Sequence, residues 1–546
     1  MKKTNCNTTP PKAAPAIVGA AVLLGGTALA SRVLGLIRDR MLAGTFGAGV
    51  DLDIYYAAFR IPDLIFTFLV LGALSAGFIP LFTRHWCKED SSKDAWRFTN
   101  NVLHILGACL VGLSILGAIF TPWILKLVAP GFDDQTLVQA VSVSRIMYIS
   151  TALLGLSSVF GGVLQSLKRF TLYAIAPLLY NIGIIIGVLV AQWTTGSIRI
   201  VAWGVVLGSL LHFLIQIYGA ANAGWRYHFV WNWKDSDARE LISMMGPRLL
   251  GLAVSQVNLI VMTAIASLLA VGSITVFNFA NNIQFVPIGI VGISFAIAAF
   301  PTMSEFANKK DTKSMIKIVS RTARNILFLI VPLTVIFLAL RAQIVRVVLG
   351  AGVFGWNETI ITANVLGFFV ISLFAQALIP LLVRVFFAYK NTSIPAIIAL
   401  ISAVINIVLA VMWSKTMGVP GIALAFSVAS IVQLILLWIG AHRKLGNINE
   451  DLILKSLVTM VGAGIVCSIV LQAMKELFAA VFPLTTFFAV LGQGLVAGIS
   501  GLAVYLIIAW VFKSPELSLL ASGLKRKLFK KPYIAESADE AIESSY

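Results

Sequence analysis

The stretch TLYAIAPLLYNIGIIIGVLVA (171–191) is twenty-one residues long and contains no charged side chain. As an α-helix it is long enough to cross the roughly 30 Å of hydrocarbon in a lipid bilayer. Runs of the same kind, such as ALISAVINIVLAVMW (399–413), recur along the 546 residues. Hydrophobic residues make up 59% of the chain and charged residues only 12%, about half of their usual share in soluble domains. The sequence therefore predicts an all-α polytopic membrane protein.

The apolar runs predict about fourteen transmembrane helices. Between them we find no short alternating strands of the kind that build outer-membrane barrels. The predicted helices lie near residues 16–40, 54–82, 99–128, 138–165, 172–193, 200–222, 241–270, 275–302, 317–340, 360–388, 394–414, 420–441, 454–480 and 487–512.

The formal net charge of +18 is distributed unevenly between the loops. If the N-terminus lies in the cytoplasm, the inner loops hold nearly all of the basic loop residues, for example Lys309, and so does the tail KRKLFKK (525–531). The outer loops hold few, chiefly Arg199, Lys415 and Lys475. This pattern predicts that both termini are cytoplasmic and that the basic tail lies against anionic membrane lipids. It argues against a nucleic-acid partner.

The chain matches itself when it is shifted by about 222 residues. VLQSLKRFTLYAIA (163–176) then lies over RVFFAYKNTSIPAI (384–397), so that Lys168 aligns with Lys390, and three further matches occur in the same order. The repeat contains six helices, so its two copies enter the membrane in the same orientation, as in many transporters. We expect a central cavity between the two halves.

The predicted organisation has five parts. They are a cytoplasmic N-terminal tail (1–15), a first six-helix half (16–225), a second six-helix half (240–445), helices 13 and 14 (452–513) and a basic cytoplasmic tail (514–546).

The first helix carries four charges in SRVLGLIRDR (31–40). Arg32 and Asp39 are seven residues apart and share a face, whereas Arg38 and Arg40 are expected to point elsewhere. An arginine at the centre of a membrane helix costs about 2.5–3.5 kcal/mol on insertion scales, so such charges usually serve a function. The alternative is that they pair with one another or extend to the interface and serve only packing and topology.

The second helix repeats this spacing with Asp53 and Arg60. Charges of both signs on two neighbouring helices favour a water-filled cavity that receives a charged ligand. Arginine presents a planar fork of donors that matches phosphate and carboxylate oxygens, whereas lysine acts as a point charge. The sequence therefore predicts a ligand that carries phosphate or carboxylate groups.

The second half contributes amides in FNFANNIQF (277–285), where Asn278, Asn281 and Asn282 share a helix face. Hydrogen bonds between helices and contacts with a ligand are both consistent with this pattern. Arg248 and Arg384 are further candidate ligand-binding residues in this half.

Catalytic and metal-binding motifs are not expected to act in this chain. HWCKED (85–90) fits a His-x4-Asp acyltransferase pattern, but it lies on a short basic loop without a surrounding soluble domain. The histidines and cysteines lack the spacing of metal sites, and no Walker motif occurs. We expect no cofactor, no metal and no enzymatic activity. Gly204 and Gly208 form a GxxxG pair that predicts close helix packing.

Several longer stretches resemble the MurJ (MviN) family of lipid II flippases, within the multidrug, oligosaccharidyl-lipid and polysaccharide exporter superfamily. They are SRVLGLIRDRMLAGTFGAGVDLDIYYAAFRIPD (31–63), GALSAGFIPLF (72–82), MGPRLLGLAVSQ (245–256) and RVFFAYKNTSIP (384–395). The resemblance implies a multi-pass protein of the bacterial cytoplasmic membrane that moves lipid II from the inner to the outer leaflet by alternating access. That transport supplies peptidoglycan synthesis and thereby maintains cell shape. Lipid II, membrane lipids and wall-synthesis enzymes are the partners that it suggests.

The motif match implies that the lipid headgroup is bound by Arg32, Arg38, Asp39, Asp53, Arg60 and Arg384. Other positions depart from the family pattern. Many members have an arginine pair where this chain has Phe66 and Thr67, and an arginine where it has Asn282. Arg248 would then compensate, or the substrate would differ. The alternatives are a flippase for another polyprenyl-diphosphate glycan, a multidrug exporter of the same superfamily, and a non-transporting scaffold for wall enzymes.

Overall fold

The computed structural model describes residues 14–71, 77–87 and 92–528, and within these ranges the chain is helical with no strand. A first bundle contains α1 (Ala14–Phe46), α2 (Val50–Phe66), the π-helical segment η1 (Thr67–Leu71), α3 (Ile79–Trp86), α4 (Ser92–Val128), α5 (Asp134–Ser166), α6 (Phe170–Trp193) and α7 (Ile198–Asn222). The long helix α8 (Ser236–Ser267) follows it.

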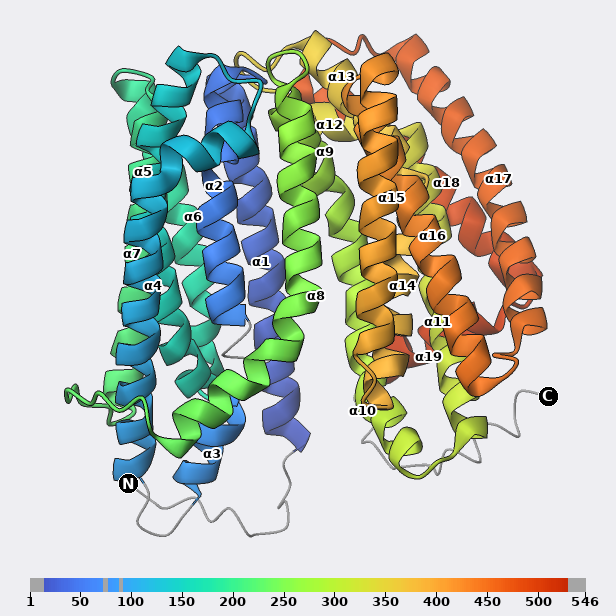
Figure 1. The fold of residues 1–546 in the computed structure, drawn as a ribbon. Helices are drawn as coiled ribbons and strands as arrows, with labels where there is room; N and C mark the ends of the chain where they lie inside the picture. The colour runs from blue at the N-terminus through green and yellow to red at the C-terminus, as the bar shows by residue number, and fades with distance from the viewer. Residues whose placement is uncertain (1–13, 72–76, 88–91, 529–546) are drawn as a thin grey trace.

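A second bundle contains α9 (Ser273–Pro287), the π-helical segment η3 (Ile288–Ile293), α10 (Ser294–Asn308), α11 (Thr312–Ala339), α12 (Arg341–Leu349), α13 (Trp356–Val370), α14 (Leu373–Ala388), α15 (Ser393–Met417) and α16 (Val419–Leu445). Helices α17 (Glu450–Val481), α18 (Phe487–Val511) and α19 (Pro515–Leu528) pack on its outer side. Figure 1 shows the two bundles side by side, with α8 between them.

Among the described residues, ten helices are long and apolar enough to cross a membrane, and the bent pair α13 and α14 would make eleven. The chain is therefore a polytopic helical membrane protein, and where the structure describes the predicted ranges they fall mostly on helices. Helix α2 lies outside this count because its 17 residues include four charged ones, Asp51, Asp53, Arg60 and Asp63. Two short helices were not predicted, α12 and α19, and the latter lies in the segment expected to be a tail.

Three of the predicted helices are interrupted, two of them at a π-helical segment that follows a proline. The range 54–82 is divided by η1, which follows α2 and its Pro62, and the range 275–302 is divided by η3, which follows Pro287. The range 360–388 bends by 46° between α13 and α14. The first two breaks follow a proline, which lacks the N–H that continues the helical ladder.

The two bundles share one hydrophobic core at one end and have separate cores at the other. The shared core joins Leu52 and Ile54 of α2 to Phe279 of α9 and Phe354 before α13. At the opposite end, where α3 and α10 lie, the first bundle has its own core around Phe82 and the second bundle another. Among the described residues, the hydrophobic core that the two bundles share lies at the end where α2 and α9 begin.

Glycines allow the backbones of the two bundles to touch at this joined end. Gly352 and Gly272 have positive φ angles of 48° and 86°, and a Cβ on either would collide with a carbonyl oxygen of the first bundle, that of Gly44 or Ala48. The N–H of Val353 donates to the Gly44 oxygen at 3.0 Å. Side chains larger than hydrogen would hold the bundles apart here.

Helices α6 and α7 cross through two interlocked GxxxG pairs. Gly204 and Gly208 of α7 lie against Gly187 and Gly183 of α6, so closely that a Cβ on any of the four would collide with the opposite backbone. The prediction of close packing at Gly204 and Gly208 is confirmed, and Gly183 and Gly187 complete the contact.

We expect Gly208→Val to destabilise the first bundle, because its side chain would have to occupy space filled by the Tyr180 backbone. The measurement is the thermal midpoint of the detergent-solubilised protein by size-exclusion chromatography. Gly112→Val in α4 is the matched control, since a Cβ at Gly112 meets no atom within 4 Å. Equal midpoints for the two variants would contradict the packing argument.

Helix α19 is attached by a buried carboxylate. Glu516 is 3% exposed and forms an ion pair with Arg324 of α11 at 3.2 Å. Its two oxygens also accept hydrogen bonds from Ser456 of α17 and Ser514, at 3.0 and 2.7 Å. These contacts tie α17 and α19 to the second bundle through one side chain.

Candidate functional site

The charged residues of α2 contact α9 across the boundary between the bundles. Arg60 is 7% exposed and donates from Nε to Thr263 Oγ1 and from Nη2 to Asn278 Oδ1, both at 2.7 Å. The amide of Asn278 donates in turn to the Ile274 carbonyl at 2.7 Å, which orients its oxygen toward Arg60. A buried guanidinium is thus held by neutral oxygens, and it does not extend to the interface.

Asp53 caps the first turn of α9 from the opposite bundle. Its carboxylate accepts hydrogen bonds from the N–H groups of Gly272 and Thr275, at 2.7 and 2.8 Å, and from Thr275 Oγ1 at 2.6 Å. The first N–H groups of a helix lack intrahelical partners, and Gly272 at the N-cap has no side chain to satisfy them. Asp53 and Arg60 therefore face α9 together, as their seven-residue spacing predicts.

A second polar chain runs from α6 through α1 to α9. Arg38 binds Asp39 Oδ1 through Nε and Nη2, at 3.0 and 2.8 Å, and donates from Nη1 to Asn181 Oδ1 at 3.1 Å. The other oxygen of Asp39 accepts from Asn282 Nδ2 at 3.2 Å. The prediction that Arg38 points away from Asp39 is wrong, because the long arginine side chain reaches around the helix to its neighbour.

Arg38 remains partly accessible, whereas Asp39 does not. The exposed fraction of the Arg38 side chain is 23%, and that of Asp39 is 5%. The three donated bonds leave one N–H on each terminal nitrogen of Arg38 for another partner. Arg38 is therefore placed to bind a further acceptor.

Arg32 contacts the second bundle by packing. Its guanidinium lies over the ring of Phe285 at 5.7 Å, and a Cβ on Gly289 of η3 would collide with it. Among the described residues, neither Arg32 nor Arg60 forms an ion pair with a carboxylate. The boundary between the bundles thus holds guanidinium groups whose positive charge is not neutralised in a pair, which favours an anionic ligand.

The other predicted residues are not joined to this group. Arg384 of α14 is half-buried and donates to the Pro380 carbonyl of its own helix at 3.1 Å. Arg248 belongs to α8, and its side chain lies outside the described residues. Arg40 points away as expected, to the Val347 carbonyl at 2.6 Å and the ring of Phe487.

Three positions that depart from the family pattern carry uncharged side chains that contact other elements. Thr67 accepts a hydrogen bond from Gln256 of α8 at 2.7 Å, and Asn282 binds Asp39 as described. Phe66 packs against the core of the first bundle around Phe82. These side chains join elements together where an arginine would have carried charge.

Three residues near the site were missed by the sequence reasoning. They are Asn181, Thr263 and Asp63, whose side chain is exposed one turn after Arg60. Asn181 had a clear signal, since it is an amide in the middle of the apolar run 171–191. Thr263 had none, because a threonine in a membrane helix commonly bonds to its own backbone.

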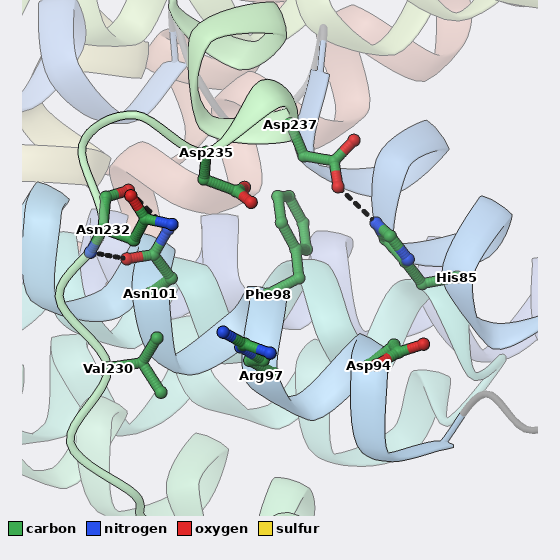
Figure 2. Close-up of a pocket in the computed structure, with 9 residues that line it drawn as sticks. All are labelled: His85, Asp94, Arg97, Phe98, Asn101, Val230, Asn232, Asp235 and Asp237. Atoms are coloured by element: carbon green, nitrogen blue, oxygen red, sulfur yellow. Dashed lines mark hydrogen bonds and ion pairs between the residues drawn. The ribbon is translucent and has the colours of Figure 1, made fainter.

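The described part of the HWCKED stretch has a structural role at the end of the first bundle where α3 lies. His85 and Asp237 of α8 line a pocket of about 220 Å³, drawn in Figure 2. The Nε2 atom of His85 lies 2.7 Å from Asp237 Oδ2. Asp90 lies outside the described residues. Arg84 binds Asp237 and Glu240 at 2.6 and 2.7 Å. The hydrogen bond to Glu240 raises the pKa of the Arg84 guanidinium. These contacts join α3 to α8.

Among the described residues, no cluster of His, Cys, Asp and Glu could hold a metal ion.

Comparison with known proteins agrees with the resemblance seen in the sequence. Residues 42–492 match the family model described as lipid II flippase MurJ. A probable lipid II flippase MurJ of Rhizobium meliloti is 28% identical over 516 residues, which is 92% of this chain and 95% of the relative. The lipid II flippase MurJ of Burkholderia cenocepacia is 26% identical over 455 residues, or 82% of this chain and 88% of the relative.

Solved structures give the same result. A lipid II flippase MurJ in an inward closed conformation superposes with a TM-score of 0.74 and 25% identity, covering 90% of this chain and 98% of that one. An inward-facing multidrug transporter of the MATE family shares the fold, with a TM-score of 0.64 and 14% identity over 79% of this chain and 99% of its own. The chain belongs to the MurJ family of lipid II flippases.

Proposed function

We propose that this protein flips lipid II from the inner to the outer leaflet of the bacterial cytoplasmic membrane and thereby supplies peptidoglycan synthesis. It is a transporter and not an enzyme. The observation that carries the proposal is the group of guanidinium groups between the bundles, which suits a diphosphate. The MATE-family neighbour shares only the fold, so a drug exporter is not favoured.

The two halves predicted from the sequence form the moving parts of this transporter. The first spans 16–225 and the second 240–445. The two additional helices of segment 452–513, which correspond to α17 and α18, bring the proposed number of transmembrane helices to fourteen. Both tails, 1–15 and 514–546, lie in the cytoplasm. Lipid II enters from that side, where the bundles have separate cores.

Several pairs of equivalent local structures support this duplication. Lys168 and Lys390 align at a shift of 222 residues, and both have a φ angle of 57°. Lys168 lies between α5 and α6, and Lys390 lies between α14 and α15. The π-helical segments η1 and η3 begin 221 positions apart. Ser150 bonds to Ser209 between α5 and α7, and Ser372 bonds to Ser427 between α14 and α16.

Arg32, Arg38 and Arg60 are the residues that we propose bind the diphosphate, with Asp39 and Asn282 positioning Arg38. Two free N–H groups on Arg38 suit the two-point contact that a phosphate offers. Arg248 and Arg384 stay predicted to bind the lipid II headgroup elsewhere on its transport path. Asp53 keeps the outer end closed while lipid II binds from inside, and its contact with α9 must break before the lipid can leave.

Complementation tests the proposal. In a bacterium depleted of its own MurJ, the full-length protein is expected to restore growth and to return lipid II to the outer leaflet. The quantity to measure is the fraction of lipid II that a membrane-impermeant enzyme can modify. If well-expressed, membrane-inserted protein leaves lipid II on the inner leaflet, also with lipid II from its own source, the substrate is another polyprenyl-diphosphate glycan.

A further inference from the structure

An extended segment with alternating aromatic residues follows α7. Residues 225–234 read WRYHFVWNWK, with an aromatic side chain at every second position from 225 to 233, and we call this segment the strap. Trp225 is buried, but the other four are exposed: Tyr227 by 60%, Phe229 by 73%, Trp231 by 47% and Trp233 by 44%. Four neighbouring exposed aromatic residues form a patch that is unfavourable in water and typical of a contact surface.

The strap is held in place by two buried asparagines of α4. Asn100 donates to the Arg226 carbonyl at 3.0 Å and accepts from Trp225 Nε1 at 3.0 Å. Asn101 donates to the Asn232 carbonyl at 3.0 Å and accepts from its N–H at 2.8 Å, as Figure 2 shows. Both ends of the strap are therefore fixed to α4, and its exposed aromatic side chains project from a backbone held in place by hydrogen bonds.

The length of α4 places the strap at the inner edge of the hydrocarbon. Trp123, 63% exposed, lies near the outer end of α4. A bilayer core takes about twenty helical residues, so its inner edge falls about twenty positions earlier, next to His104. The ring of His104 lies 5.4 Å from that of Tyr227 and 4.9 Å from that of Phe229. The aromatic residues of the strap thus reach the level where hydrocarbon meets headgroups.

Helix α7 leads to the same level. Its exposed aromatic residues are Trp203 near the start and Tyr218, 58% exposed, one turn before the helix ends and the strap begins. Tryptophan and tyrosine are enriched at both membrane interfaces because one part of the ring system is apolar and the other is polar. Tyr218 therefore continues the aromatic surface of the strap onto the lipid-facing side of α7.

Basic side chains lie between the aromatic ones. Arg226, His228 and Lys234 are exposed on the strap, and Arg97 is exposed on the adjoining turn of α4. Lysine and arginine next to the inner leaflet are attracted by its anionic headgroups. The combination of alternating aromatic and basic groups at this depth suits a lipid interface better than a protein partner.

We propose that the strap is an inner-leaflet anchor in which Tyr227, Phe229, Trp231 and Trp233 insert between the headgroups of anionic phospholipids while Arg226 and Lys234 bind their phosphates. The proposal uses the membrane orientation proposed above, with the strap on the cytoplasmic side, and does not depend on which lipid-linked glycan is flipped. Because Ser236 begins α8 directly after the strap, the anchor also holds the inner end of α8 at a fixed depth.

Photo-crosslinking of the full-length protein tests the anchor. Benzoylphenylalanine replaces Phe229, and the protein is reconstituted into vesicles of phosphatidylethanolamine and phosphatidylglycerol. Irradiation is expected to attach lipid to the protein, as detected by mass spectrometry. Benzoylphenylalanine at lipid-facing Trp123 is the positive control, and at Asn308, exposed at the end of α10, the negative control. Absence of lipid adducts at 229 when they form at 123 would overturn the proposal, and so would a protein adduct in native membranes.

The charge of the lipid gives a second test. Compared with vesicles of phosphatidylethanolamine and phosphatidylcholine, vesicles in which phosphatidylglycerol replaces the phosphatidylcholine, at about a quarter of the lipid, are expected to raise the adduct yield at 229 by about threefold or more. Arg226→Gln combined with Lys234→Gln is expected to remove that increase and leave the yield at 123 unchanged. A yield at 229 that is independent of phosphatidylglycerol would refute binding of anionic lipid. Lipid adducts that persist when lipid II flipping fails would show that the anchor and the transport function are separate.

Discussion

Replacing Arg38 by alanine is expected to lower lipid II flipping by about 100-fold while the protein stays folded in the membrane. Two charge-assisted hydrogen bonds to phosphate contribute on the order of 3 kcal/mol together, and each 1.4 kcal/mol is a factor of ten. The loss also leaves the Asp39 carboxylate without its cation beside the expected position of the diphosphate. Both effects act in the same direction.

The controls for Arg38→Ala separate charge from fold. Arg40→Ala removes an equal charge two residues away, where the side chain contacts Val347 and Phe487, so it should leave the affinity for the diphosphate intact. Adding Asp39→Asn to Arg38→Ala should restore part of the rate by removing the repelling carboxylate. Flipping would be measured in vesicles with purified lipid II. A normal rate for Arg38→Ala would remove Arg38 from the binding site.

Asp53→Ala is expected to lower flipping at least about tenfold by opening the outer end of the protein. The carboxylate accepts three hydrogen bonds from the first turn of α9, and hydrogen bonds to a charged group make a net contribution of about 1.5–3 kcal/mol each. Their loss would shift the equilibrium between the two orientations away from the one that accepts lipid from inside. Asp53→Asn keeps one acceptor oxygen and should have an intermediate effect.

Distances between spin labels would report this shift. Labels introduced as unnatural amino acids at Trp193 and Lys415 lie at the outer ends of α6 and α15, one on each bundle, and both positions are exposed. Asp53→Ala should lengthen the distance between them. Asp51→Ala is the matched control, because Asp51 carries the same charge and makes no hydrogen bond to α9 among the described contacts. An unchanged distance in Asp53→Ala would mean that the cap does not hold the outer end closed.

Hydropathy and charge were sufficient to predict the class of the protein and the position of its helices. Long apolar runs have only one stable arrangement in lipid, because every backbone group must find its partner within the helix. The same rule does not indicate where a helix is interrupted, so 54–82 was predicted as one continuous helix although η1 divides it. A proline such as Pro62 marks a helix that can be broken, but the packing around it decides where the break occurs.

The partners of the charged residues were harder to predict than the residues themselves. A helical wheel places Cβ atoms, and the guanidinium of Arg38 extends several bonds beyond its Cβ, which is why its contact with Asp39 was missed. Arg60 binds Asn278, which is 218 positions away in the sequence. The internal repeat indicated this contact, because one of its matches places AGVDLDIYY (48–56) over VGSITVFNF (271–279), where α2 and α9 begin. Equivalent helices can meet at the axis that relates the halves.

Among the described residues, the charged groups that join α1 and α2 to α8 and α9 all belong to the first bundle. Arg60 donates hydrogen bonds to a hydroxyl and to an amide oxygen. Asp53 accepts hydrogen bonds from backbone N–H groups and a hydroxyl, and Asp39 accepts one from the side-chain amide of Asn282. When the bundles separate, no cation has to leave an anion behind, and water can replace each neutral partner at little cost. Strong ion pairs at this contact would stabilise one relative orientation of the two bundles over the other. Neutral partners make it a reversible hinge, whose position the charged headgroup itself can set.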